Sequence, residues 1–222
     1  MSSPMTERTT RRYAATARRE RAEQERQATR RRVVDAARRL FLAHGYAGTT
    51  IADIATEAGV AVQSVYKAGT SKAALLQTAM DVAVAGDDAD VEMLDRDPFR
   101  AVFDETDPVR QVAICAGLIA STQERSAPMQ VVFREAAAVD DTIAAKLDAE
   151  LERRHATFAA LIRAIPQDRL RESHEESTDL AWAIGSSEVF LLLRNRRNWT
   201  ADHYLESITR VLVDVLLTPT GP

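Results

Sequence analysis

The chain has 222 residues, and its 45% of hydrophobic residues with only 8 glycines and 7 prolines favours an all-helical protein of one large or two small domains. No apolar run reaches the roughly 18 residues of a membrane helix, and the arginine-rich N-terminus lacks the apolar core of a secretory signal. The single cysteine, Cys115, cannot form an internal disulfide. We therefore expect a cytoplasmic protein without a membrane partner. The net charge of −4 hides an asymmetry, because residues 1–80 hold 14 Lys and Arg against 7 Asp and Glu while residues 81–222 hold 15 against 26.

The basic first third begins with an arginine-rich arm, residues 1–29. Residues 1–12 carry no apolar pattern and are expected to be disordered, and residues 13–32 are helix formers without an apolar face. Such a segment is typical of a chain whose N-terminal part meets a polyanion. The alternative, a solvated arm that makes no contact with DNA, stays open.

Four helices are predicted after the arm. They cover residues 33–44, 50–58, 61–68 and 71–85. The first shows apolar residues spaced by three and four and ends at Gly45. Thr50 and Asp53 form the pattern of a capping box at the start of the second. Gly59 permits a tight turn, and Ser71 is the expected cap of the fourth.

The second and third helices are short and joined by a turn with glycine, which is the helix-turn-helix arrangement. The later helix of that motif enters the major groove of DNA, about 12 Å wide, and contacts base edges. Three valines are expected to anchor it inward, namely Val60, Val62 and Val65. An ordinary helical hairpin with a polar face is the alternative.

The outward side chains of this helix suit DNA. Glutamine pairs with adenine through two hydrogen bonds, Ser and Tyr hydroxyls bind phosphates or bases, and lysine adds charge. Thr50 and Lys72 lie at helix starts, where backbone N–H groups and the helix dipole attract phosphate. With two arginines after the arm, the predicted DNA-contacting residues are Thr50, Gln63, Ser64, Tyr66, Lys67, Lys72, Arg30 and Arg31.

An acidic linker at 86–98 ends in proline and separates this region from residues 99–222. Helices are expected there at 107–123, 129–139, 140–165, 176–197 and 200–217. The four histidines lie far apart, and no phosphate-loop, dinucleotide or hydrolase motif is present. We therefore expect no enzyme, no metal site and no cofactor other than a small-molecule effector.

Residues 30–76, RRRVVDAARRLFLAHGYAGTTIADIATEAGVAVQSVYKAGTSKAALL, resemble the DNA-binding domain of the TetR family of bacterial transcriptional regulators. The motifs AA-x-x-LF, GY-x-x-TT, IA-x-x-AGV, VY and SK-x-x-LL occur in order and spacing. The resemblance implies an all-α homodimer, with a helix-turn-helix domain at 30–85 and an effector-binding and dimerisation domain at 99–222. It also implies that effector binding releases a palindromic operator.

Several positions depart from the family pattern. Ala61 stands where the family usually has a serine that caps the third helix. Ala68 and Gly69 replace an aromatic residue or histidine followed by phenylalanine, and Ala73 replaces a glutamate. These changes remove a helix cap and a ring that packs the third helix against its neighbours.

The resemblance places the dimer interface on the last two helices. The candidates are Leu191, Tyr204, Ile208, Val211, Leu212 and Val215, unless this stripe packs only within the subunit. Five side chains that could surround an effector, or be plain core, are Cys115, Met129, Phe133, Phe158 and Trp182. Arg134 or His155 could supply a polar anchor.

The sequence therefore predicts a DNA-binding repressor released by a small-molecule effector. The same fold would also serve an activator or an effector-independent regulator. A helical enzyme lacks any catalytic constellation, and a helical interaction protein that has lost DNA binding remains as the last alternative.

Overall fold

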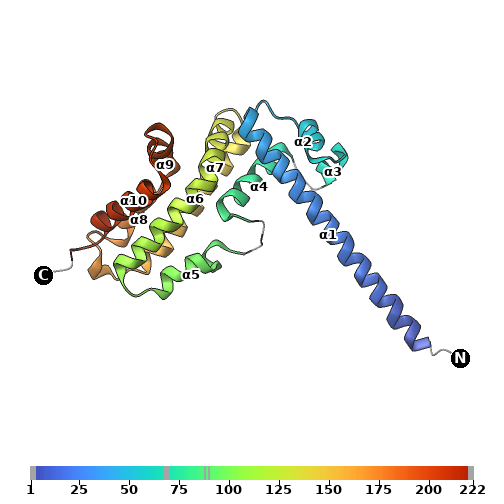
Figure 1. Cartoon of the computed structure of the whole chain (residues 1–222), viewed down its shortest axis with the longest axis horizontal. Coiled ribbons are helices and arrows are strands. Elements are labelled where there is room, and N and C mark those ends of the chain that lie inside the picture. Colours follow the sequence, from blue (N-terminus) through green and yellow to red (C-terminus); the bar gives the residue numbers. More distant parts are fainter. Residues whose placement is uncertain (1–3, 68–70, 88, 90, 220–222) are drawn as a thin grey trace. The chain divides into compact units, whose positions relative to one another are not determined.

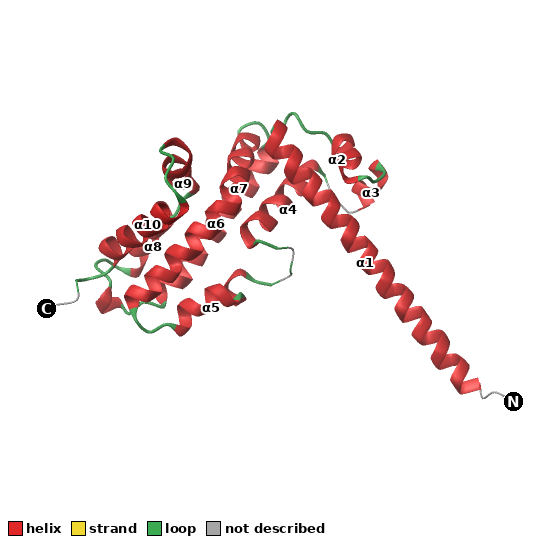
Figure 2. Ribbon diagram, in the orientation of Figure 1, coloured by secondary structure: helices red, strands yellow, loops and turns green. Residues whose placement is uncertain are grey.

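The structure is a computed structural model that describes residues 4–67, 71–87, 89 and 91–219, without the side chains of residues 4–17 and of Lys67. The departures at Ala68 and Gly69 lie outside the described residues. Throughout the part described, helices and connecting loops make up the fold, and the all-α prediction is confirmed (Figure 2). The chain divides into two compact units, Met1–Ala79 and Met80–Pro222.

The first unit contains α1 (Pro4–His44), α2 (Ile51–Ala58), α3 (Val62–Lys67) and the first half of α4 (Lys72–Ala85) (Figure 1). Helix α1 is continuous over 41 residues, about 60 Å at 1.5 Å per residue. It includes residues 4–12, where the sequence pattern predicted disorder, so that expectation is wrong for these residues. The other three helices follow the predicted boundaries to within one or two residues.

The end of α1 packs by the predicted apolar stripe. Val33, Ala37 and Phe41 are buried, and Gly45 takes a left-handed φ of 70° as the helix ends. His44, in the last turn of this helix, is exposed. The other helices complete the core of this unit with Ile54, Ala55, Ala58, Val65, Leu75, Leu76 and Ala79.

The second unit holds the remaining helices. They are α5 (Asp97–Asp104), α6 (Pro108–Ala137), α7 (Asp141–Arg163), α8 (His174–Ile184), α9 (Ser187–Leu191) with a π-helical turn at Leu192–Arg196, and α10 (Ala201–Leu216). Short 3-10 turns lie at Met93–Asp95 and Gln167–Arg169. Helix α10 packs against α6 and α8, and α7 packs against the same two helices.

Two predicted helix boundaries are wrong. Residues 107–123 and 129–139 were predicted as separate helices, but α6 runs through both. Pro128 removes one backbone hydrogen bond, yet α6 continues because buried residues on both sides of it, Ala127 and Met129 among them, hold its inner face. Conversely, the predicted helix 176–197 is broken at Gly185. A Cβ there would lie 3.0 Å from the Phe158 ring, which is tighter than ordinary contact, and Ser186 caps the start of α9 by accepting the Val189 N–H.

The core of the second unit is built from α6, α7, α8, α9 and α10. Its buried members include Val112, Ala116, Ile119, Ile162, Ile165, Phe190, Tyr204, Ile208 and Leu212. Phe190 and Tyr204 meet edge to face at 5.1 Å between ring centroids, and Phe158 and Leu191 pack at the margin of this core.

Candidate functional site

The start of α2 has the predicted capping box. The Thr50 hydroxyl accepts a hydrogen bond from the Asp53 backbone N–H at 3.1 Å, and the Asp53 carboxylate accepts one from the Thr50 N–H at 3.0 Å. The hydrogen bonds from Thr50 also lower the pKa of Asp53. Arg39 of α1 pairs with Glu57 of α2 at 3.0 Å. Thr50 is exposed. Because its hydroxyl and its backbone N–H both form hydrogen bonds, its side chain is held in a fixed position.

The turn between α2 and α3 depends on Gly59. Its φ of 65° is left-handed, and its N–H reaches back to carbonyls of α2. The following N–H, of Val60, bonds to the carbonyl of Ala55 at 2.9 Å. These bonds satisfy the free carbonyls at the end of α2 and direct the chain into α3.

Helix α3 presents a polar face to solvent. Gln63 is exposed, Ser64 half-buried, and Tyr66 60% exposed, while Val65 on the opposite side is fully buried. The expectation that Val62 points inward is wrong, since it is 42% exposed. Positions 62 and 66 are one helical turn apart, so Val62 shares the outward face with Tyr66.

Helix α4 follows α3 in the chain. Ser71 caps it as predicted, since its hydroxyl accepts the Ala74 N–H at 3.1 Å. The Lys72 ammonium lies 4.1 Å from the centroid of the Tyr46 ring, a cation–π contact that positions the charge. Arg30 and Arg31 are exposed on α1. The predicted contact at Lys67 falls on a side chain outside the described residues.

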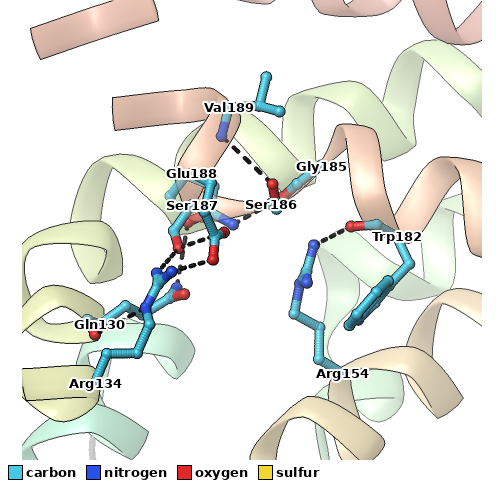
Figure 3. A network of polar contacts seen from close by, with 10 residues as sticks. Gln130, Arg134, Arg154, Trp182, Gly185, Ser186, Ser187, Glu188 and Val189 are labelled. Carbon is cyan, nitrogen blue, oxygen red and sulfur yellow. Dashed lines mark hydrogen bonds and ion pairs between the residues drawn. The ribbon is translucent and has the colours of Figure 1, made fainter. Parts of the chain in front are cut away.

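In the second unit, polar side chains converge on the junction between α8 and α9. Arg134 of α6 pairs with Glu188 and donates to the buried Ser187 hydroxyl. Gln123 of α6 donates to the Gly185 carbonyl at 2.8 Å. Figure 3 shows this network, with Arg134 extending toward the start of α9. Burial raises the pKa of the Glu188 carboxyl, but its own backbone N–H, the charge of Arg134 and the Ser187 hydroxyl outweigh that effect, so the pKa lies below its ordinary value.

A second guanidinium, from Arg154 of α7, reaches the same junction (Figure 3). It donates to the Trp182 carbonyl at 2.5 Å and lies 5.0 Å from the centroid of the Phe158 ring and 5.3 Å from that of Trp182. Tyr204 of α10 is close enough for the charge of Arg154 to act on its hydroxyl. We call Arg154, Phe158, Trp182 and Tyr204 the Arg154 cluster.

Burial changes the acid–base behaviour of this cluster. It lowers the pKa of Arg154 to about 10, which leaves the guanidinium charged at neutral pH. It raises the pKa of the Tyr204 hydroxyl to about 12, so the phenol stays protonated. The cluster is thus a cation beside neutral hydrogen-bond donors.

The five predicted effector residues do not form one cluster. Phe158 and Trp182 meet at Arg154, whereas Met129 and Phe133 are fully buried in α6 and Cys115 is half-buried there. His155 contacts Asp179 at 2.8 Å and the edge of Trp182. Sequence reasoning missed Arg154, although its four-residue spacing from Phe158 places both on one face of α7.

The six predicted dimer residues differ in exposure. Tyr204, Ile208 and Leu212 are buried within the single chain. Leu191 and Val215 are half-buried, and Val211 is 41% exposed. Of the six, Val211 therefore has the most surface to offer a partner.

The second half of α4 is attached to the body of the second unit. Arg125 of α6 donates to the Val84 carbonyl at 3.1 Å, and Arg153 of α7 lies 3.6 Å from Asp81. After α4, Arg96 pairs with Asp87 and donates to the Ala89 carbonyl. Helix α4 runs from Lys72 to Ala85, so Asp81 and Val84 belong to its second half. None of the helices in the described ranges combines the length and the hydrophobicity that a membrane span requires.

A comparison with protein families finds a match within the first unit. Residues 33–79 match a family model described as bacterial regulatory proteins, tetR family. None of the curated proteins searched matches the chain.

Solved structures match nearly the whole chain at low sequence identity. NalD, the secondary repressor of the MexAB-OprM multidrug efflux pump in Pseudomonas aeruginosa, is 20% identical, with a TM-score of 0.63 over 86% of this chain and 98% of that one. A protein of Mesorhizobium loti assigned to the TetR family is 15% identical, with the same TM-score over 87% and 98%. A regulator of Saccharomonospora viridis solved with choline is 16% identical, again at 0.63, over 86% and 98%. At these identities the likeness shows the fold.

Proposed function

We propose that this chain, a TetR-family regulator by its N-terminal domain and its fold, is a transcriptional repressor that binds a palindromic operator as a homodimer and releases it on binding a small-molecule effector. The observation that carries the DNA-binding part is the outward face of α3. Its six residues span about 9 Å, which fits a major groove about 12 Å wide.

Each residue of this face has a role that its chemistry supports. Gln63 would read a base through its amide, and Val62 would contact a thymine methyl group. Tyr66 and Ser64 would bind phosphate or base edges with their hydroxyls. The buried Val65 holds the helix in place behind them.

Phosphate contacts would fix the orientation of the domain. Thr50 and Lys72 lie at the starts of α2 and α4, where the helix dipole favours an anion. Arg30 and Arg31 are exposed on α1 and would add charge, as would Lys67. These contacts position the protein without reading sequence.

Release by an effector is supported by the position of α4. The helix begins with Lys72, and its second half is bonded to α6 and α7 through Arg125 and Arg153. A ligand that shifts α6 or α7 would therefore act on the second half of α4. Among proteins of this fold, NalD is a repressor and the Saccharomonospora viridis protein was solved with a small molecule. In this proposal residues 30–85 bind DNA, and residues 99–222 bind the effector and dimerise, in the cytoplasm.

The test is a titration of the purified full chain against DNA fragments that flank its own gene, in a salt series with competitor DNA. We expect one fragment to bind with resistance to competitor, and footprinting to show two symmetric half-sites. Equally weak binding to every fragment would contradict the proposal and favour a helical interaction protein. Measuring transcription with the operator placed at a promoter then separates a repressor from an activator.

A further inference from the structure

The Arg154 guanidinium has unused hydrogen-bonding capacity. Guanidinium carries five N–H donors, and among the described residues Arg154 makes one hydrogen bond, to the Trp182 carbonyl, and no ion pair. By contrast, Arg134 is paired with Glu188 and Arg153 with Glu150. Within the part of the chain that the structure describes, Arg154 is a half-buried cation that forms no ion pair, although the charges of Glu188 and Glu150 act on it from a greater distance.

Two other donors of the cluster are also unsatisfied. The Trp182 indole nitrogen and the Tyr204 hydroxyl oxygen are buried and have no hydrogen-bond partner among the described residues. Leaving a buried polar group unpaired is unfavourable, and native structures rarely do so without a ligand or water. Tyr204 is 1% exposed and lies in the core of the unit, so its ring is fixed.

The charges around the junction define what would fit. Arg134, Arg154 and Glu188 sum to one positive charge. Glu150 also acts on Arg154, and it shares Arg153 with Asp81, so the three arginines and three carboxylates of this wider group balance one another. A ligand with one negative charge therefore suits the site better than a dianion, which would add two charges to a balanced group. The rings of Phe158 and Trp182 beside the guanidinium are half-buried and offer apolar surface.

We propose that the Arg154 cluster binds the carboxylate of a monoanionic effector whose apolar or aromatic body packs against Phe158 and Trp182. Arg154 donates to the carboxylate through its free N–H groups, and the Tyr204 hydroxyl and the Trp182 indole N–H donate to its oxygens. This inference rests on the proposed effector-responsive function and names the chemical class of the effector.

The test uses the full chain with Trp199→Phe, which leaves Trp182 as the remaining tryptophan and a reporter at the site. The probes are octanoate and 4-phenylbutyrate, each with the amide and the amine of the same body. We expect both carboxylates to change the Trp182 emission and to bind at least ~10-fold more tightly than their amides, because hydrogen bonds to a charged group are the stronger ones. The amines should bind more weakly still, since they are positively charged and Arg154 repels them.

Variants then assign the effect to residues. Arg154→Met should remove the preference for carboxylate over amide, and Arg163→Met, an exposed arginine on the same helix, should keep it. Tyr204→Phe should weaken carboxylate binding ~5-fold or more, the size of one hydrogen bond. Tighter binding of an amine, failure of both carboxylates to bind, or unchanged carboxylate affinity in either Arg154→Met or Tyr204→Phe would overturn the proposal. The comparison of acid, amide and amine in the parent chain decides the question even if a variant fails to fold.

The two proposals fail in different ways. The probes are titrated against protein without DNA, and binding to the operator fragment is measured separately without probe. Retained operator binding with no carboxylate preference would refute the ligand class alone. Loss of specific DNA binding would refute the proposed function, whatever the probes do.

Discussion

Cys115 lies half-buried on α6, where desolvation raises the pKa of its thiol to about 12. The thiolate is the reactive form, so alkylation at pH 8 should be at least ~100-fold slower than in the denatured chain, whose thiol has a pKa of about 8.5. The rate should rise tenfold per pH unit as long as the fold persists. Mass spectrometry of iodoacetamide-treated protein checks this, and equal rates in the two states would contradict it.

The sign of the accompanying stability change follows from the same shift. The folded protein holds the thiol proton more tightly than the unfolded chain. Stability from this group is therefore complete below the ordinary pKa of a thiol and falls as the pH rises toward 12.

At single residues, the sequence predicted local chemistry well and tertiary placement poorly. The capping hydroxyls of Thr50 and Ser71 act within three residues of themselves, so their pattern was sufficient. Val62 was expected to point inward on hydrophobicity alone, but one-turn spacing from Tyr66 places it outside. Arg154 was missed because its partners come from α8 and α10, which only folding brings together.

Among the elements, the basic part of α1 is the one whose role depends most directly on DNA. Arg18, Arg19, Arg21 and Arg26 are exposed on the part of α1 before Val33, which has no apolar face. Such a helix gains little from packing, and its charge would serve contact with phosphates. Two roles remain for this part of α1: its arginines contact the phosphates of the duplex, or it is a solvated arm without DNA contact.

Changing these four arginines to glutamine tests the arm while keeping good helix formers. If the arginines neutralise phosphates, the slope of log K against log salt for operator binding should become shallower by about 0.9 for each phosphate that is no longer neutralised. The matched control changes Glu20, Glu23 and Glu25 to glutamine and should leave the slope at least as steep. An unchanged slope in the arginine variant would mean that the arm makes no phosphate contact.

The boundaries of elements show the same limit on prediction from sequence. Gly45 and Gly59 mark helix ends through their own left-handed backbone, and both were placed correctly. The helices predicted at 107–123 and 129–139 are one helix, α6, because its buried face extends on both sides of Pro128. The segment 176–197 is divided at Gly185, where Ser186 caps the start of α9, and the contact of Gly185 with the Phe158 ring comes from a distant part of the chain.

For the whole molecule, dimerisation is the main prediction. Of the proposed interface residues, Val211 is exposed on α10 while Tyr204, Ile208 and Leu212 form the subunit's own core. Val211→Glu should therefore yield a folded monomer, because it introduces a charge at an apolar contact without disturbing the core. Light scattering coupled to size-exclusion chromatography measures the mass, and circular dichroism confirms the fold.

The control for this prediction is Val139→Glu, which changes a 76% exposed valine between α6 and α7 and should leave the dimer intact. A dimer that survives Val211→Glu would exclude this face of α10 as the interface. Because a palindromic operator requires two reading heads, the monomeric variant should also bind the operator more weakly than the parent chain.

The central claim is that the outward face of α3 reads DNA sequence. The most direct measurement compares Gln63→Ala with the parent chain on the footprinted operator and on unrelated DNA at one salt concentration. We predict a loss of about 10-fold or more on the operator, from the ~1–3 kcal/mol that a bidentate base contact contributes to discrimination, and little change on unrelated DNA. Equal affinity of the two proteins for the operator, or an equal loss on both DNAs, would contradict the account.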